Sequence, residues 1–418
     1  MQTVSSLLDA TLIPLVGLLA LVWATLSLYL LIAGRRSRDA SRIVRAVLDE
    51  LTRLEASSLS PEEQIREVER IAGRLDRVML LRIAATLPDR SPLSEAFARV
   101  VTNRHKLDWF VQQASATRGP RANWRRIAAL RLLAHQGYSG IVPLLARAVA
   151  EPDSEIAGAA LAILGRTPDM KAAEILVTAL KTHQYSPSRL ATFLDRFPLP
   201  IPNLLRPLLH HPDATVRYWA VMLLARHRQA PAIESEVAAL TADPAPLVRR
   251  AAVASLAQLN PAAAVAVARP LLADPVWFVR AHAARAIGET EDAEHAREIA
   301  PLLADREWWV RTAAKEALER MGPEVWSALV PYLDHADGFA RNGAAEVLQN
   351  IGILDSLIIL EAATLRPSPE KIEMLRKIAS AGGTRMTEAL LDRVDQDTRP
   401  RVRSLLASLG LEPAGARS

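Results

Sequence analysis

The sequence predicts an all-α protein, an α-solenoid of stacked helical hairpins preceded by one transmembrane helix. Three observations predict it. Few glycines and aromatics, with abundant Ala, Leu, Glu and Arg, favour helices over strands. A long uncharged run lies near the N-terminus, and one seven-residue phrase recurs at a fixed spacing further on. Half of the 418 residues are hydrophobic, which is enough to bury a large core.

Residues 11–33 read TLIPLVGLLALVWATLSLYLLIA and contain no charge. At about 1.5 Å per residue this helix is roughly 34 Å long, enough to cross a bilayer core. A cleavable signal peptide needs a basic start and a shorter apolar core, and MQTVSSLLDA supplies no basic residue. By the positive-inside bias, residues 1–10 are predicted to face outside and the rest to be cytoplasmic, because five arginines follow the span: Arg35, Arg36, Arg38, Arg42 and Arg45.

Residues 34–58 are predicted to form a basic amphipathic juxtamembrane helix. Apolar residues recur at helical spacing beside the arginines, among them Val47, Leu51 and Leu54. This face would lie on the inner leaflet or pack on the next domain.

Residues 59–118 are predicted to be a helical N-terminal region without an obvious repeat. SPEE, from Ser60, supplies an N-cap, a proline at the first helical position and a glutamate at the third. ATRGPRAN then indicates a connector.

Residues 119–410 are built from a repeat, and residues 411–418 form a tail. DPAPLVR, DPVWFVR and DREWWVR, which end at Arg249, Arg280 and Arg311, fall 31 residues apart. Looser copies are HPDATVR, ending at Arg217, and HADGFAR, ending at Arg341. Weaker copies are SPEKIE, RPRVR and the segments 155–164 and 186–193.

One helix face follows from the spacing around each of these arginines. A small residue recurs three positions after it and an aliphatic residue seven positions after it, as in Ala252 and Leu256 after Arg249. A second helix closes each unit with a phrase such as ARPLLAD, IAPLLAD or LVPYLD. Each unit is therefore predicted to be a helical hairpin that must stack on its neighbours to bury its apolar face.

The pattern resembles the HEAT repeat family, specifically the bacterial subclass named after the HEAT-like repeats of phycobilisome lyases. The resemblance covers roughly residues 124–409 and is strongest over 211–334. It implies an α-solenoid in which acid and arginine side chains form a structural ladder, each acid also capping a helix start. The ladder residues would be Arg217, Asp243, Arg249, Asp274, Arg280, Asp305, Arg311 and Arg341.

The two positions before each Val-Arg or Ala-Arg pair are variable, and they are aromatic in consecutive units. The partner-binding candidates are Trp277, Phe278, Trp308, Trp309 and Phe339. Trp277 and Trp308 would form one column, and Phe278, Trp309 and Phe339 another, at the first turns of successive helices. Such a ridge is typical of a protein-binding hot spot, but one member of each pair could instead close the seam between repeats. We expect one of Trp308 and Trp309 to be buried and the other exposed.

No catalytic residue, metal site or cofactor is predicted, and we expect the protein not to be an enzyme. The absence of cysteine excludes disulfides, thiolate metal sites and a cysteine nucleophile. His210 and His211 are adjacent and cannot share a helical face, and His335 lies in a turn. The sequence contains no Gly-rich phosphate loop and no nucleophile elbow. A small-molecule substrate is therefore not expected.

The sequence favours a membrane-anchored scaffold or adaptor that binds protein partners, themselves membrane-associated, at the cytoplasmic face of a bacterial inner membrane. One alternative is a nucleic-acid-binding protein related in fold to alkylpurine DNA glycosylases. The balance of 51 basic to 46 acidic residues is too even for a strong polyanion binder. A further alternative, suggested by the name of the subclass, is an enzyme like the bilin lyases.

Overall fold

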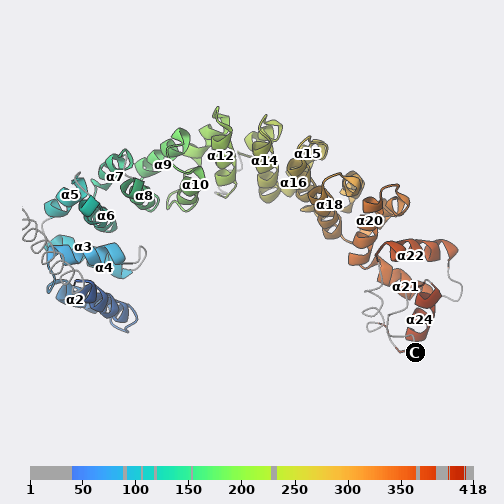
Figure 1. The fold of residues 1–418 in the computed structure, drawn as a ribbon, viewed down its shortest axis with the longest axis horizontal. Helices are drawn as coiled ribbons and strands as arrows, with labels where there is room; N and C mark the ends of the chain where they lie inside the picture. The colour runs from blue at the N-terminus through green and yellow to red at the C-terminus, as the bar shows by residue number, and fades with distance from the viewer. Residues whose placement is uncertain are drawn as a thin grey trace, which may run out of the picture. The chain divides into compact units, whose positions relative to one another are not determined.

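The computed structural model describes residues 40–87, 92–104, 107–116, 120–151, 154–226, 233–363, 368–382, 394, 396–408 and 410. Within these ranges the regular elements are all helices, as the sequence predicts (Figure 1). The expected N-terminus (1–10), transmembrane helix (11–33) and tail (411–418) lie outside the described residues. Among the described helices, none is by itself long and apolar enough to cross a membrane. Two of them pass that test only as a pair bent by 71°.

The chain divides into two compact units. The first comprises residues 1–176 with 196–199, and the second comprises residues 177–195 with 200–418. Each is described by itself below.

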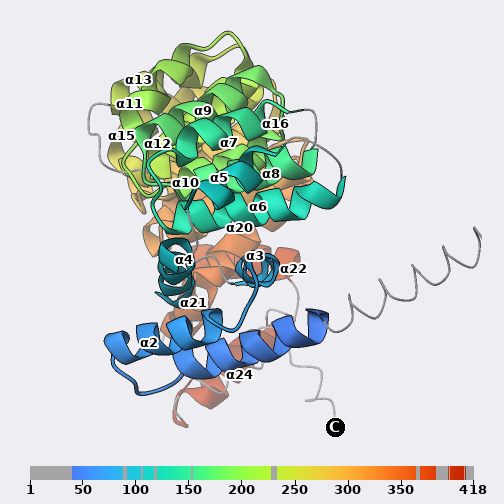
Figure 2. The same ribbon diagram turned by 90° about the vertical axis from the view of Figure 1, so that its left-hand side faces the viewer.

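The first unit begins with a helix over residues 40–55 that packs on α2 (Pro61–Ala72) (Figure 2). Its Val47, Leu51 and Leu54 are buried, and Glu50 pairs with Arg70 of α2 at 2.7 Å. Of the two placements that the amphipathic pattern allows, the structure therefore shows packing on the next helix for this apolar face.

The start of α2 confirms the predicted capping signal. The Ser60 side chain accepts a hydrogen bond from the Glu63 amide, and the Glu63 carboxylate accepts one from the Ser60 amide. Pro61 occupies the first helical position, where no amide donor is required.

The rest of the first unit is a stack of short helices around an apolar core. The α3 and α5 helices pack against α6, and α7 packs against α8. Phe97, Phe110 and Leu130 are among the fully buried side chains. The helices are α3 (Arg77–Thr86), α4 (Pro92–Arg104), α5 (Leu107–Ser115), α6 (Pro120–His135), α7 (Ile141–Val149), α8 (Ser154–Leu164) and α9 (Met170–Thr182), which continues into the second unit.

The second unit contains a row of long helices in which each packs on the next (Figure 1). The predicted helix face is confirmed, because the small and aliphatic residues three and seven positions after each arginine are buried, such as Ala283 and Ile287 after Arg280. The residue before each of these arginines, such as Val279, is buried as well. Alanine in the middle of that face lets the helices approach closely. The row consists of α12 (Ala214–Arg226), α14 (Pro246–Leu259), α16 (Trp277–Gly288), α18 (Trp308–Arg320) and α20 (Gly338–Asn350).

The second helix of each hairpin is less regular than the sequence predicts. Pro270 lies inside α15 (Pro261–Leu271), and in other units the equivalent proline stands in a 3₁₀ segment, such as Pro301 in η5 (Ala300–Ala304). Proline lacks the amide that an α-helical turn needs, so the closing phrase ends in tighter turns. The other segments are α11 (Pro202–Leu205), η1 (Arg206–His210), α13 (Glu234–Ala239), η3 (Leu240–Ala242), η4 (Ala293–His295), α17 (Ala296–Ile299), η6 (Pro323–Val325), α19 (Trp326–Leu329) and η7 (Val330–Asp334).

The remaining helices of the second unit are α10 (Pro187–Asp195), α21 (Ile353–Ala363), α22 (Pro369–Gly382) and α24 (Arg399–Ser408). The α22 helix packs on α20, and α24 packs on α21. The weak sequence copies SPEKIE and RPRVR therefore lie at helix starts, in α22 and α24.

Candidate protein-binding surface

The Asp and Arg residues of the repeat form a ladder between successive helices of the second unit. Each arginine donates from Nε and Nη2 to the two carboxylate oxygens of the aspartate in the next repeat, at 2.7 to 3.0 Å. Its Nη1 donates to backbone carbonyls of its own repeat, such as that of Asp243 for Arg249. The three bidentate rungs are Arg217 with Asp243, Arg249 with Asp274, and Arg280 with Asp305.

The aspartates do not cap the helices in the predicted way. Asp274 accepts a hydrogen bond from the amide two residues on, that of Val276, and Val276 itself is the N-cap of α16. Asp243 and Asp305 bond the amides of Ala245 and Glu307 in the same manner. Each aspartate therefore holds the turn before the helix, because its place in the repeat is two residues too early for the cap position.

The ladder aspartates are almost completely shielded from solvent and still ionise readily. Burial opposes their ionisation, but the arginine and the backbone amide donate hydrogen bonds that outweigh it. The pKa of Asp243, Asp274 and Asp305 is accordingly lowered from its ordinary value. These carboxylates are structural counter-ions.

Histidines replace aspartate at the ladder position in the flanking repeats. The Nδ1 atoms of His211 and His335 accept the amide hydrogen bond two residues on, as the aspartates do elsewhere. An imidazole ring lacks the two carboxylate oxygens that accept hydrogen bonds from a guanidinium group. Among the described residues, Arg311, which precedes His335, accordingly pairs with no carboxylate. Arg341 pairs with none either, and both arginines donate to backbone carbonyls of their own repeats. The predicted ladder therefore has fewer rungs than its arginines suggest.

The predicted aromatic residues form an exposed ridge at the first turns of α16, α18 and α20. Trp308 is 56% exposed and Trp309 54%, while Trp277 is 37% and Phe339 64% exposed. The expectation that one of Trp308 and Trp309 is buried is wrong, because the seam between repeats is already filled by Val310 and Ala314, which have no exposed area. Phe278 is the half-buried member. We call Trp277, Phe278, Trp308, Trp309 and Phe339 the aromatic ridge.

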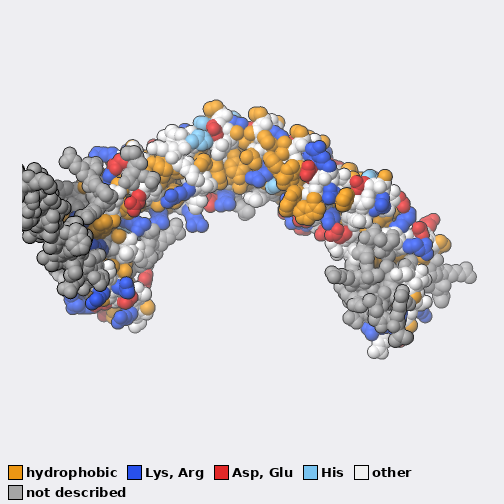
Figure 3. All heavy atoms as spheres, in the orientation of Figure 1, with side chains coloured by type: hydrophobic (Ala, Val, Ile, Leu, Met, Phe, Trp, Pro, Cys, Tyr) orange, Lys and Arg blue, Asp and Glu red, His pale blue; other side chains and the backbone are white. Residues whose placement is uncertain are grey.

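The rings of the aromatic ridge meet diagonally between repeats. Trp277 stacks on Trp309, with centroids 6.5 Å apart and planes at 22°, and Trp308 meets Trp309 edge-on at 4.6 Å. The sequence predicts Trp277 beside Trp308, so the predicted columns are corrected to a crossing contact. Hydrophobic side chains gather over α14, α16 and α18 in Figure 3. Trp277 also meets Phe278 edge-on at 5.6 Å, so the structure brings four of the five predicted aromatics into one contiguous cluster.

Basic side chains accompany the aromatic ridge. The Arg311 guanidinium lies over the Phe339 ring at 4.3 Å from its centroid. Arg306, one turn before Trp309, is highly exposed and has only a loose contact with Glu307 at 3.8 Å. The surface therefore combines large apolar area with guanidinium groups, the residue types that dominate binding hot spots.

An apolar groove lies further along the second unit, and sequence reasoning did not find it. It encloses about 860 Å³ and is lined mainly by Trp326, Leu333, Leu357, Leu360 and Met374. Its rim carries the ion pair of Lys377 with Asp334 at 2.7 Å. The apolar run in α21 was a signal for it, but the groove needs α19, α21 and α22 side by side, which no single stretch reveals.

The predicted basic residues near the membrane are only partly described. Arg42 is exposed, and Arg45 lines a small hollow with Arg82 and Trp124. Arg82 lies over the Trp124 ring at 5.4 Å. Arg35, Arg36 and Arg38 lie outside the described residues.

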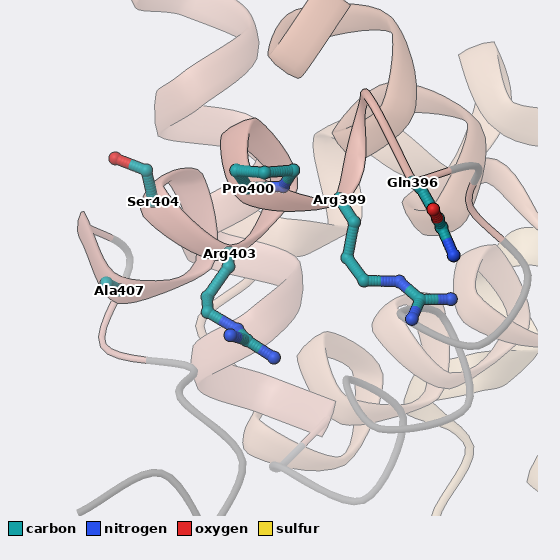
Figure 4. Close-up of a pocket in the computed structure, with 6 residues that line it drawn as sticks. All are labelled: Gln396, Arg399, Pro400, Arg403, Ser404 and Ala407. Atoms are coloured by element: carbon teal, nitrogen blue, oxygen red, sulfur yellow. The ribbon is translucent and has the colours of Figure 1, made fainter.

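A second basic hollow, of about 670 Å³, lies beside α24, with the guanidinium groups of Arg399 and Arg403 on the same side (Figure 4). Arg399 donates to the Val394 carbonyl at 3.3 Å. Within the described part of the chain, no group of three or more His, Asp and Glu residues is placed to hold a metal ion.

A family model of HEAT repeats matches residues 201–288, 233–319 and 269–349. These three overlapping matches include the ladder rungs and the aromatic ridge. This part of the chain therefore consists of HEAT repeats. No curated protein sequence matches the chain.

Several solved structures are similar to this chain at low identity. Human deoxyhypusine hydroxylase in complex with glycerol is 17% identical, with 61% of this chain and 98% of that chain covered and a TM-score of 0.26. Kap121p bound to Nup53p is 11% identical, with 88% and 49% covered and a TM-score of 0.43. Kap121p bound to the extreme C-terminus of the phosphatase Cdc14p is also 11% identical, with 88% and 50% covered and a TM-score of 0.44. The matched part is about half of each Kap121p chain.

Proposed function

We propose that this chain, whose residues 201–349 are HEAT repeats, is a membrane-anchored, non-catalytic scaffold or adaptor that binds protein partners through the aromatic ridge. It would act at the cytoplasmic face of a bacterial inner membrane, with the N-terminus outside. Its partner would be a membrane-associated protein.

The observation that carries the proposal is the exposure of Trp277, Trp308, Trp309 and Phe339 in three consecutive repeats. Burying apolar surface yields about 25 cal/mol per Å², so a cluster of large rings left in water is a ready source of binding energy. The ladder and the buried helix face hold the repeats together without any contribution from these rings. Their exposure is thus explained better by recognition than by folding.

Membrane anchoring rests on the sequence of residues 11–33 and on the arginines that follow it. The helix over residues 40–55 comes shortly after the proposed span and packs on α2 through Leu51 and Leu54. Because few residues separate the proposed span from this helix, the first unit would be held close to the bilayer.

A non-catalytic role is supported by what the charged residues of the repeats do. Arg217, Arg249 and Arg280 each donate from Nε and Nη2 to one carboxylate and from Nη1 to backbone carbonyls, so they are not available to nucleic-acid phosphates. The lowered pKa of their aspartate partners follows from these ion pairs. Structural pairs of this kind give no sign of acid or base catalysis.

The test is co-purification of partners from detergent-solubilised native membranes, followed by mass spectrometry. The intact protein is compared with a Trp308→Ala/Trp309→Ala variant. The matched control is Met170→Ala, which removes an exposed apolar side chain at the start of α9, outside the ridge. Thermal melting of all three proteins verifies that the variants fold.

The expected result is one membrane-protein partner that is lost in the double tryptophan variant and retained in the control. The partner should stay bound to the intact protein in about 0.5 M salt, because an interface anchored by aromatic side chains depends little on ionic strength. Contacts with nucleic-acid phosphates would weaken steeply with salt. A partner retained by both variants would place the interface elsewhere. Recovery of nucleic acid that is released by salt would replace the proposal with its alternative.

A further inference from the structure

A basic hollow of about 760 Å³ lies within the first unit, between the ends of α6 and α8, one face of α4 and residues 196–198. Its volume is in the range of small-molecule sites, roughly 300–1,000 Å³. Its polar lining consists mainly of Arg99, Arg131, Arg166, Arg196, His135 and Gln136.

The charge of the lining favours an anion. Four guanidinium groups, which stay protonated at any physiological pH, face one carboxylate, that of Glu95. The C-terminal ends of α6 and α8 add roughly half a negative charge each. A surplus of about two positive charges remains, before any contribution from His135.

Two of the arginines form no ion pair with a described carboxylate, unlike the paired arginines of the ladder. Arg131 donates from Nη1 to the Ala85 carbonyl at 2.9 Å and forms no ion pair with a described residue. Arg196 is exposed at the hollow and likewise forms no ion pair within the described residues. Arg99 has only a long, exposed contact with Glu95, at 3.7 Å. Most of their donor groups are therefore available to a ligand.

A third observation concerns the wall of the hollow. The side-chain oxygen of Gln136 is buried and has no hydrogen-bond partner among the described residues. Buried polar atoms of folded proteins nearly always have a partner, so this one calls for an explanation. The atom is closed off from solvent in the structure, so a movement of the Gln136 side chain would be needed to bring its amide to a ligand.

We propose that this hollow binds a small organic molecule with two or more phosphate charges. The guanidinium forks would hold the phosphate oxygens in pairs, since their planar donors match that geometry. The apolar body would lie against Ile163, Pro168 and Pro198. The same chemistry is offered by a soluble phosphate ester and by a lipid headgroup. The site is independent of the protein-binding ridge.

The test is isothermal titration calorimetry of the full-length protein in detergent micelles at low salt. Inorganic tripolyphosphate represents the soluble source and dihexanoyl phosphatidic acid, a short-chain lipid, represents the headgroup. The variant is Arg131→Gln/Arg196→Gln. The matched control, Arg147→Gln/Arg297→Gln, removes the same charge from two exposed arginines outside the hollow.

We expect at least one probe to bind saturably to the intact protein. Its affinity should be at least about tenfold lower in Arg131→Gln/Arg196→Gln and should change less than about threefold in the control. Preferential binding of the short-chain lipid would assign the headgroup, and preferential binding of tripolyphosphate a soluble ester. Because Arg131 also donates to the Ala85 carbonyl, the single variant Arg196→Gln, which loses no hydrogen bond or ion pair with a described residue, must weaken binding as well. No saturable binding, or an equal loss in the control, would overturn the proposal.

Discussion

The guanidinium of Arg311 lies over the ring of Phe339 instead of pairing with a carboxylate. In the three preceding repeats the equivalent arginine meets an aspartate of the next repeat. The corresponding residue after Arg311 is His335, whose Nδ1 is already used to accept the Asp337 amide. One residue difference therefore ends the ladder and places an arginine against an exposed aromatic ring.

Replacing His335 with aspartate should restore the missing rung. The new carboxylate would accept the Asp337 amide and the Arg311 fork together, as Asp305 does for Glu307 and Arg280. We expect a gain of about 1 kcal/mol in the free energy of unfolding, measured by urea denaturation. His335→Asn, which can accept the amide but carries no charge, is the control. Equal stability of the two variants would show that Arg311 gains nothing from a carboxylate.

Removing the arginine of a middle rung should destabilise the second unit strongly. Arg249→Ala leaves Asp274 buried without its counter-ion, and breaking a buried pair in this way costs about 3 kcal/mol. The exposed Arg306→Ala should cost less than about 0.5 kcal/mol. The urea midpoints of the two variants, with unfolding followed by tryptophan fluorescence, check this. The double variant Arg249→Ala/Asp274→Ala should recover part of the loss, since no unpaired charge remains.

Acid should weaken the ladder. The pKa of Asp243, Asp274 and Asp305 is lower in the folded chain than in the unfolded chain, because arginine and amide hydrogen bonds outweigh burial. Their contribution to stability is fully present above the ordinary aspartate pKa, about 3.9, and is lost as the pH falls through the lower folded value. The melting temperature should therefore fall steeply below about pH 4.

The double variant Arg249→Ala/Asp274→Asn isolates the effect of one rung, since other carboxylates of the chain titrate in the same range. Its melting temperature should depend on acid less steeply than that of the intact protein. If the melting temperature of both proteins fell equally with pH, the acid sensitivity would not come from the ladder.

Gly288 and Gly343 should respond oppositely to alanine. A methyl group at Gly288 would stand 2.8 Å from the Ala317 Cα atom, where α16 and α18 touch, so Gly288→Ala should cost about 1–3 kcal/mol. At Gly343 the nearest atom is the movable Leu303 Cδ2 at 3.2 Å. There the higher helix propensity of alanine, up to about 1 kcal/mol, should leave stability unchanged or improved. A destabilisation at Gly343 as large as at Gly288 would contradict this account of the contact.

The sequence was sufficient for the architecture of the repeats, because that architecture depends on short-range spacing. Val310, Ala314 and Leu318 stand four residues apart and must share a helix face, and all three are buried. The pairing of Arg280 with Asp305 also follows from the 31-residue period, which places equivalent residues of neighbouring repeats together. Whether the aspartate caps the helix or holds the preceding turn was harder to predict, because the two positions differ by only two residues.

The exposure of the ridge, the apolar groove and the basic hollow of the first unit could not be predicted in the same way. Whether Trp308 or Trp309 closes a seam depends on how much space Val310 and Ala314 leave, which only packing determines. The arginines of the basic hollow come from positions as far apart as Arg99 and Arg196, without a shared period. The prolines of the closing phrases ARPLLAD, IAPLLAD and LVPYLD stand in the sequence, but a regular second helix was predicted, and the structure shows tighter turns there.

The two positions before each Val-Arg pair take no part in the rungs, yet they determine what the surface presents. Pro246 with Leu247, Trp277 with Phe278 and Trp308 with Trp309 occupy the same backbone places with different chemistry. Under the proposed function, these variable positions would determine which partner is recognised, while the rungs and the buried helix face hold the repeats together. Pairs of residues could be exchanged between repeats as cassettes, which makes this chain a starting point for directing a repeat protein to new targets without redesigning its core.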